Sequence, residues 1–492
     1  MSMEEEYVKL IFGLKLRQIR TDKGLSLFQL GKISGLSKSY LNEIEKGKKY
    51  PKTDKIILLA ESLEVSYEDL VSLKLDKNLA PISGILQSKL LKEIPFELFG
   101  IEERDLIEII SNAPSKVNAF ISTMIEIGNN YNLTRESFFL AALRSYQEAN
   151  DNYFPEIEAA AKNFMKAYLI DEKDEINEDW MLEILKEEFG YQIIFEDFSS
   201  ELQTLRSIYK PKNKELYINN SADLNQIRFI LAKELGYNYL KLEERLLTFS
   251  WAKFESFDQL LNNFYASYFA GAILLPEENL VRDMNRMFDI NRFNPEIFEN
   301  VMRKYTESPE TIYQRMTNLF AKHFKINDLF FLRLSYKVGT DSYKLTKELH
   351  LNQHQSPHAN ESDEHYCRRW VSVRVLQDFE KVKDEKSHLL DAQISVYPFQ
   401  NQNEYFVISS ATVDPFNSDL LRSVTLGVKL EAAQKKIKFL KDPKIPVKKV
   451  AVTCENCGME NCSERAAHPK RYLKKLQNQQ LNEAIDAFIG SN

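Results

Sequence analysis

The chain of 492 residues contains 43% hydrophobic and 28% charged residues, which suits soluble globular domains and excludes wholesale disorder. Four cysteines are too few for a disulfide-dense secreted protein, and no apolar run approaches the ~18 residues that suggest a membrane span. The net charge is −7, but residues 14–52 hold ten Lys/Arg against three Asp/Glu, a local +7 that leaves −14 elsewhere. We therefore expect a cytoplasmic, multidomain α+β protein, with no membrane partner and a basic module for a polyanion.

The N-terminal region predicts short helices, because its apolar residues recur at helical spacings. Ser26 and Ser37 are expected N-caps, and Gly35 supplies the turn between two helices. The pattern predicts an all-α domain over residues 1–73, followed by a helical connector over residues 74–175.

Polar and basic side chains follow the turn at Gly35, where a recognition helix presents its first residues to the major groove. The stretch 16–65 resembles the helix-turn-helix of the xenobiotic-response-element (Cro-like) family, although Leu27 stands where that family often has glutamine. The resemblance implies operator DNA as a partner, bound by a homodimer. The alternative is a helical scaffold with a solvated basic face. The expected DNA-binding residues are Ser37, Lys38, Ser39, Tyr40, Asn42, Lys46, Lys48 and Lys49.

Short strands are expected within residues 191–219, and a long helix from about Asp223 contains the sequence FILAKELGYNYL. With histidine in place of Lys233 and Tyr237, this helix would read H-E-x-x-H, the zinc-binding motif of metallopeptidases. A lysine ammonium has no lone pair for a metal, so Glu234 would lack the metal-bound water that it activates as general base.

The order of strand, hairpin and two helices resembles the ImmA/IrrE metallopeptidase fold, in which the third zinc ligand corresponds to Asn263. All three ligand positions are thus changed. We expect a degenerate, metallopeptidase-like α+β domain over residues 176–325, kept as a packing scaffold between modules. The disfavoured alternative is a zinc metallopeptidase that cleaves a repressor.

The C-terminal domain is expected over residues 326–492, with a polar loop at 341–366 and apolar strands beyond it. His350, His354 and His358 are spaced by four, but Pro357 makes a helix there unfavourable, so we expect them in the loop. We expect an α/β sensor domain.

The cysteines predict a metal site. Cys454, Cys457 and Cys462 have the spacing C-x2-C-x4-C, and Cys367 lies far upstream. Four thiolates suit a tetrahedral zinc or an iron–sulfur cluster, and the spacing alone does not choose between them. His468 is a spare zinc ligand.

The whole layout resembles the short-chain fatty acyl transcriptional regulators of propionate and acetate metabolism, through C-x-x-W at 367–370 and the final motif at 446–469. The resemblance implies an acyl-CoA ligand, a 4Fe–4S cluster and no enzymatic activity. Eight lysines in 429–449 could meet coenzyme A phosphates, DNA or only water. An antitoxin-like protein-binding module is the remaining alternative.

Overall fold

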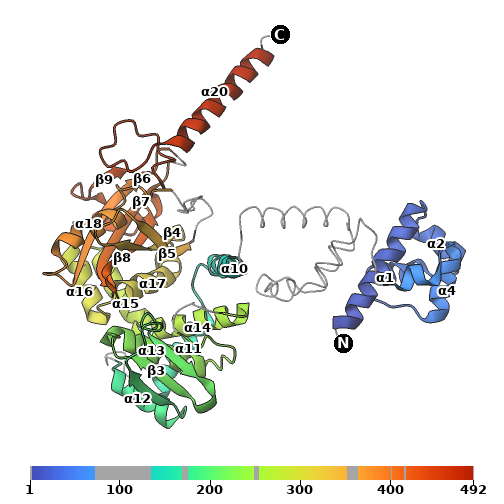
Figure 1. The fold of residues 1–492 in the computed structure, drawn as a ribbon, viewed down its shortest axis with the longest axis horizontal. Helices are drawn as coiled ribbons and strands as arrows, with labels where there is room; N and C mark the ends of the chain where they lie inside the picture. The colour runs from blue at the N-terminus through green and yellow to red at the C-terminus, as the bar shows by residue number, and fades with distance from the viewer. Residues whose placement is uncertain are drawn as a thin grey trace. The chain divides into compact units, whose positions relative to one another are not determined.

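The structure is a computed structural model that describes residues 3–72, 135–168, 176–248, 254–351, 364–399, 402–414 and 417–490. The chain divides into two compact units, residues 1–142 and 143–492 (Figure 1). Most of the predicted connector, residues 74–134, lies outside the described residues. Among the helices that the structure does describe, none combines the length and the hydropathy that a membrane span requires.

The first unit contains the predicted short helices around one small core. Leu16, Leu30, Leu41, Ile44 and Leu59 are buried together there, as their helical spacing requires. The helices are α1 (Met3–Asp22), α2 (Leu27–Ser34), α3 (Lys38–Glu45), α4 (Thr53–Ser62) and α5 (Tyr67–Val71), and α10 (Arg135–Ala149) spans the boundary between the units.

The second unit begins with a three-stranded sheet in the order β1-β3-β2, packed on helices; we call this part the small-sheet domain. The predicted strands are confirmed, with β1 parallel and β2 antiparallel to β3. Its elements are α11 (Pro155–Ala167), α12 (Glu178–Glu187), β1 (Gln192–Glu196), β2 (Ser207–Lys210), η2 (Pro211–Asn213), β3 (Glu215–Asn219), α13 (Leu224–Tyr239) and α14 (Phe257–Leu274).

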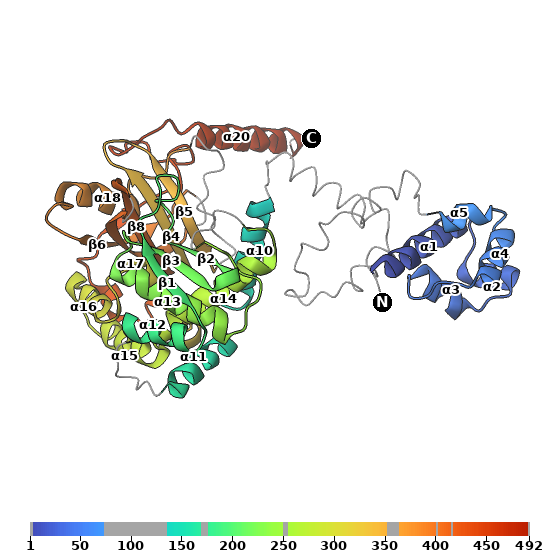
Figure 2. The same ribbon diagram turned by 60° about the horizontal axis from the view of Figure 1, so that its bottom comes forward.

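A six-stranded sheet in the order β5-β4-β8-β7-β6-β9 forms the large-sheet domain (Figure 2). Its strands are β4 (Leu329–Lys337), β5 (Tyr343–His350), β6 (His388–Val396), β7 (Glu404–Asp414), β8 (Asn417–Lys429) and β9 (Val447–Lys449). Its helical elements are α15 (Glu277–Phe288), α16 (Pro295–Tyr305), α17 (Pro309–Leu319), η3 (Phe320–Phe324), α18 (Val371–Val382), α19 (Leu430–Ala433), η4 (Lys438–Lys441) and α20 (Lys470–Gly490).

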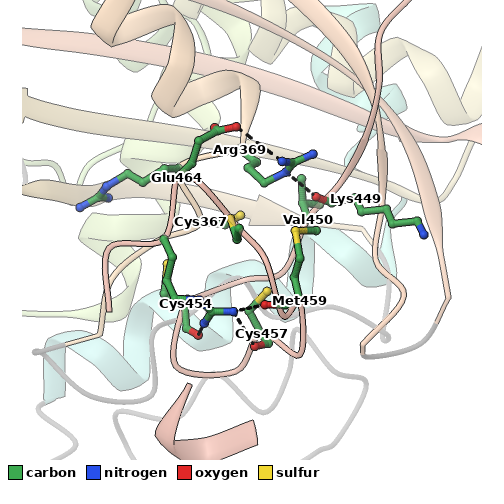
Figure 3. A pocket seen from close by; sticks show the side chains of 11 residues that line it. Cys367, Arg369, Lys449, Val450, Cys454, Cys457, Met459 and Glu464 are labelled. Carbon is green, nitrogen blue, oxygen red and sulfur yellow. Dashed lines mark hydrogen bonds and ion pairs between the residues drawn. The ribbon is translucent and has the colours of Figure 1, made fainter. Parts of the chain in front are cut away.

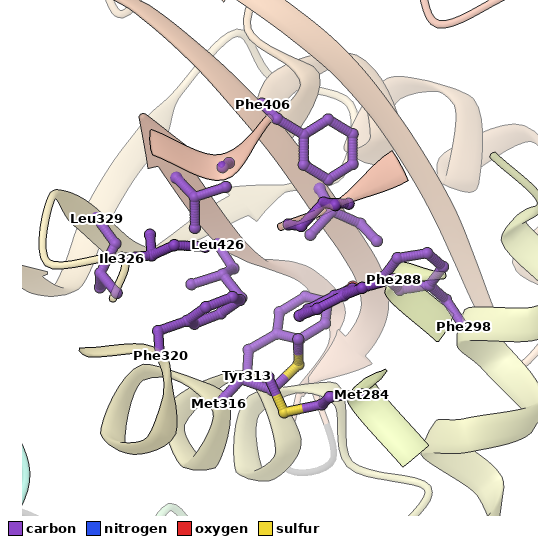
Figure 4. Packing of buried hydrophobic residues seen from close by; sticks show 14 of the residues in the cluster. Met284, Phe288, Phe298, Tyr313, Met316, Phe320, Ile326, Leu329, Phe406 and Leu426 are labelled. Atoms are coloured by element: carbon purple, nitrogen blue, oxygen red, sulfur yellow. The ribbon is translucent and has the colours of Figure 1, made fainter. Parts of the chain in front are cut away.

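Helices cover both faces of this sheet. Alternate residues of a strand point to opposite sides of a sheet, so neighbouring residues of β7 enter two different cores. Phe406 lies in a core with Tyr313 and Met316 of α17 (Figure 4), whereas its neighbours Tyr405 and Val407 lie in the core that contains α18. Both faces of the strand are therefore buried, which explains its continuous apolar sequence.

Two hydrophobic cores contain helices or strands from both sides of a predicted domain boundary. Helix α11, assigned from sequence to the connector, shares the core of α12 to α14 through Phe164. Helices α15 to α17, assigned to the metallopeptidase-like domain, share a core with the large sheet. Proline and charge patterns mark the ends of elements, but only packing decides which core an element joins.

The expected polar loop over residues 341–366 is wrong in part, because residues 343–350 form β5 at the edge of the large sheet. Charged side chains on an edge strand oppose pairing with another chain, so its polar composition does not exclude a strand. His350 ends β5 beside Phe330, with ring centroids 6.3 Å apart, and His354 and His358 lie outside the described residues.

Candidate functional sites

The recognition helix α3 is built by local hydrogen bonds. Ser26 and Gln29 form a capping box at the start of α2, and Gly35 ends that helix in the left-handed conformation with φ 69°. The hydroxyl of Ser37 then accepts a hydrogen bond from the backbone N–H of Tyr40 and caps α3. Both predicted N-caps and the predicted turn are confirmed, and these bonds fix the angle between the two helices.

A buried ion pair ties the end of α3 to α1. Arg20 donates to both carboxylate oxygens of Glu45 at 2.5 and 2.8 Å, and both side chains are at most 10% exposed. Gly13 allows the close approach of the helices, because a Cβ there would lie 2.2 Å from the carbonyl oxygen of Ile44. The recognition helix is therefore held on a rigid support.

The predicted DNA-binding side chains lie mostly on the surface. Ser37, Lys38, Ser39, Asn42, Lys48 and Lys49 are exposed, and Tyr40 and Lys46 are half-buried. The ammonium of Lys49 pairs with Glu43 at 3.0 Å and lies 5.6 Å from the ring centroid of Tyr40. This face offers hydroxyl, amide and ammonium groups, which are the donors and acceptors that read base edges and phosphates.

The three changed ligand positions meet inside the small-sheet domain. Tyr237 donates a hydrogen bond of 3.3 Å to Asn263 of α14, and the Lys233 ammonium lies 5.7 Å from the Tyr237 ring centroid. All three side chains are at most 4% exposed. Gly236 lets α13 approach α14, because a Cβ there would lie 3.0 Å from the carbonyl oxygen of Ala266. Lys233, Tyr237 and Asn263, which the sequence assigns to the ligand positions, thus lie close together in the fold.

Arg245, which the sequence pattern did not single out, supplies a cation at this site. Its Nη2 donates to both carboxylate oxygens of Glu234 at 2.6 and 2.7 Å. Its guanidinium carbon lies 4.1 and 3.9 Å from the ring centroids of Tyr237 and Tyr209. Tyr191 donates a further bond of 2.9 Å to Glu234. The guanidinium of Arg245 therefore balances the charge of the buried Glu234 carboxylate.

Charge also disfavours a divalent cation here. Burial lowers the pKa of Lys233 to about 7. The nearby Glu234 carboxylate raises this pKa, and the Arg245 guanidinium lowers it further. A divalent ion beside Arg245 and this amine would add positive charge to a site with one neighbouring carboxylate, Glu234, that is already ion-paired. The ion pair and hydrogen bonds of this site therefore balance its charges within the fold.

The four cysteines line one pocket in the large-sheet domain. Cys367 reaches the others because the chain before it pairs with the chain before Cys454: the Cys367 N–H donates to Val452 at 3.1 Å, and the Cys454 N–H donates to His365 at 2.8 Å. Figure 3 shows Cys367, Cys454 and Cys457 around this pocket. Its lining residues are Cys367, Arg368, Arg369, Lys449, Val450, Cys454, Cys457, Met459, Cys462, Glu464 and Arg465.

Polar groups hold in place the loop of residues 454–462, which contains Cys454, Cys457 and Cys462. Arg465 donates to the carbonyl oxygens of Cys454, Cys457 and Met459, and the backbone N–H of Ala466 lies 3.4 Å from the Cys454 sulfur. N–H groups aimed at sulfur are typical of thiolate sites, whose reactivity and potential they tune.

All four cysteine side chains line the same pocket. Within the described parts of the chain, no three His, Cys, Asp or Glu side chains are grouped as a single metal ion would require. His468, the spare zinc ligand, is exposed and does not line the pocket. Burial raises the pKa of Cys367 to about 11, so this sulfur carries a proton at neutral pH unless a bound cation displaces it.

A cationic cluster lies around Glu310, where α17 meets β4 and β5, and it had no signal in the sequence. Arg333 and Lys347 pair with the Glu310 carboxylate at 3.1 and 3.3 Å. Burial alone would raise the Glu310 pKa, but Arg333, Lys347 and Arg206 hold it well below its usual range. Arg422, which pairs with Asp414, acts on the same group of charges. The carboxylate of Asp223 also acts on Arg206, so Glu310, Asp414 and Asp223 together partly balance these four cations.

Comparisons with known proteins agree with these domains. Residues 16–70 match the helix-turn-helix family, and residues 186–317 match the IrrE N-terminal-like domain. The chain therefore carries a helix-turn-helix segment and an IrrE-type segment, as the sequence resemblance predicted.

The chain is also similar to individual known proteins. The chain is 21% identical to the HTH-type transcriptional regulator PrpR of Mycobacterium tuberculosis, over 94% of this chain and 92% of that protein. It is 41% identical over 61 residues to the HTH-type transcriptional repressor RghR of Bacillus subtilis, which covers 12% of this chain and 45% of the repressor. A solved Mycobacterium tuberculosis transcriptional regulator has a TM-score of 0.46 and 18% identity, over 66% of this chain and 92% of that one.

Proposed function

We propose that this protein is a DNA-binding transcriptional regulator of short-chain fatty acyl metabolism that binds operator DNA as a dimer. The capped recognition helix carries this proposal, because Lys38, Ser39 and Asn42 are exposed at its first turns on a buried support. Such a helix reads the major groove with its N-terminal side chains. Lys48 and Lys49, just beyond the helix, are placed for phosphates.

Selection of bound duplexes from a random DNA library tests this proposal. The wild-type chain should enrich a two-fold symmetric motif, because a dimer places two recognition helices on successive major grooves. The variant Asn42→Ala should lose preference within each half-site and keep its non-specific binding. A library without enrichment, or an identical motif from Asn42→Ala, would contradict the proposed role of α3.

We also propose that the four cysteines hold a 4Fe–4S cluster. Cys367, Cys454, Cys457 and Cys462 line the same pocket, so the fold brings together the four thiols that the sequence offers. The donor set fits, because it consists of thiols alone and leaves no cysteine over. When bound, the cluster would supply a redox-sensitive cross-link between the segments around Cys367 and Cys454.

The cationic cluster around Glu310 supports the proposed acyl-CoA ligand. Its cations Arg333, Lys347 and Arg422 are 22, 28 and 24% exposed, so phosphate groups would meet less competition from water there than at an exposed lysine. In the segment 429–449, by contrast, Lys435, Lys441 and Lys444 are exposed, as in a solvated face.

Isothermal titration with propionyl-CoA separates the two regions. Arg422→Gln should weaken binding about tenfold or more, whereas the matched variant Lys444→Gln should leave it unchanged. The reverse result would move the ligand to the lysine-rich segment, and no heat with either acetyl-CoA or propionyl-CoA would remove the acyl-CoA proposal.

We propose no peptidase activity for the IrrE-type domain. Lys233, Tyr237 and Asn263 occupy the ligand positions, and Arg245 neutralises Glu234. Wild-type protein should therefore show no zinc-dependent cleavage of a casein substrate. Cleavage that Glu234→Gln abolishes would restore the metallopeptidase alternative.

A further inference from the structure

Arg465 bonds to the backbone of the loop of residues 454–462 at three points. Its Nη1 donates to the carbonyl oxygen of Cys454 at 3.4 Å, and its Nη2 donates to the carbonyl oxygen of Cys457 at 3.5 Å. The same Nη2 also donates to the carbonyl oxygen of Met459. This loop, all of whose residues the structure describes, contains neither a helix nor a strand. Its conformation therefore depends on bonds of this kind more than on regular backbone pairing.

The backbone of the same segment points N–H groups at the sulfurs. The N–H of Ala466, which directly follows Arg465, lies 3.4 Å from the Cys454 sulfur. A backbone hydrogen bond from Met459 to the Cys457 thiol opposes the rise in pKa that burial causes there. Hydrogen bonds of this kind orient a thiol and favour its thiolate, which is the form that binds a metal. The segment that Arg465 holds thus already directs two of its thiols.

The loop is also held from outside the pocket. The carboxylate of Glu455, which is 2% exposed, accepts the backbone N–H of His365 at 3.0 Å and lies 2.9 Å from its Nδ1. The carbonyl oxygen of Glu455 accepts the N–H groups of Arg471 and Tyr472 at 3.1 and 3.0 Å. Arg465, by contrast, lines the pocket itself. Its planar fork, with donors on two nitrogens, reaches loop positions that these outer contacts leave unsupported.

We infer that Arg465 is a positioning residue, which holds the loop of residues 454–462 in its metal-binding conformation before any metal arrives. Without this side chain, part of the metal-binding energy would have to order the loop, and the affinity would fall. The inference rests on the proposed metal site of the cysteines and names the residue that forms it in advance. The alternative is that Arg465 acts only through its charge, as a counter-charge to the thiolates.

Anaerobic titration of the metal-free, full-length chain with cobalt(II), whose thiolate complexes absorb in the near ultraviolet, tests the inference. Arg465→Gln and Arg465→Lys should each raise the cobalt dissociation constant by about 10- to 100-fold, the usual effect of losing a group that orients metal ligands. Lysine keeps the charge but lacks the fork with two nitrogens.

Arg369→Gln is the matched control for charge. Arg369 lines the same pocket, but its Nε donates to the carbonyl oxygen of Lys449 at 3.0 Å, outside the loop (Figure 3). This variant removes one cation from the pocket and leaves the three loop carbonyls bonded. It should therefore keep the cobalt dissociation constant close to that of the wild type.

Hydrogen exchange of the metal-free chain measures the order of the loop directly. The wild type should protect the loop amides already without cobalt, whereas Arg465→Gln should gain protection there only when cobalt is added. The amides of β7 report whether the domain remains folded in each variant. If Arg465→Gln lowers the protection of β7, the comparison uses Arg465→Lys in its place.

The outcomes separate this inference from the cluster of the proposed function. Wild-type affinity in Arg465→Lys, or equal losses in Arg465→Gln and Arg369→Gln, would show that charge suffices and would overturn the positioning role. Free exchange of the loop in the metal-free wild type would overturn it as well. A colourless wild type with bound zinc would remove the cluster and keep the inference, because cobalt binding depends on the thiols alone. A wild type that binds no cobalt would overturn both.

Discussion

Replacement of Glu234 by glutamine removes the charge that balances Arg245 inside the IrrE-type domain. The two side chains are only 7 and 11% exposed and share two hydrogen bonds of 2.6 and 2.7 Å. From the sequence alone we expect a small effect on stability, because Glu234 has no metal-bound water to activate. The structure changes this expectation, since the variant would leave a guanidinium buried without a counter-charge.

The expected loss follows from the cost of an unpaired buried charge. Removal of one partner of a buried ion pair destabilises a domain by about 3–5 kcal/mol. Arg245→Met should cost a similar amount, because it leaves the Glu234 carboxylate with Tyr191 as its remaining hydrogen-bond donor among the contacts described above. The double variant should cost less than the sum by roughly 2–3 kcal/mol, because neither charge is then left unpaired.

Hydrogen exchange of the backbone amides of α13 measures this loss locally in the multidomain chain. A loss of about 3 kcal/mol corresponds to a roughly hundredfold faster exchange in each single variant. Glu178→Gln is the matched control, because its ion pair with Arg228 is 27 and 28% exposed and should contribute little. Strictly additive single and double variants, or Glu234→Gln exchange at the wild-type rate, would refute the reasoning.

Three further outcomes are expected. The unfolding free energy should rise as the pH increases from about 7 towards 10.5, because Lys233 loses its proton at a lower pH in the folded state than in the unfolded state. Urea unfolding of the wild type and of Lys233→Met measures this effect, and the variant should not show the rise. Lys48→Ala should weaken all DNA sequences alike and lower the salt slope of binding by about one, whereas a changed motif would contradict a phosphate contact. Cys367→Ser should abolish the broad absorbance near ~400 nm of anaerobically purified protein, whereas His468→Ala should retain that absorbance. A colourless wild-type protein with one zinc per chain would refute the cluster.

The sequence by itself determined the local features of this protein. Ser26, Ser37 and Gly35 form the caps and the turn that their residue types predict, since these depend on a few adjacent backbone bonds. The strands around residues 191–219 and the helix after Asp223 also followed from periodicity. The loss of the metal ligands at Lys233 and Tyr237 was visible because helix spacing alone places them on one face.

Only the tertiary structure decided which distant side chains meet. Arg245 reaches Glu234 through a turn after α13, and no helical or strand period marks that approach. The charges around Glu310 come from β4, β5 and α17, which join only when the large sheet folds. Cys367 joins Cys454 because two loop segments pair beside the sheet. Periodicity reports the burial of one element at a time, whereas these sites depend on the packing of several elements, which no single segment encodes.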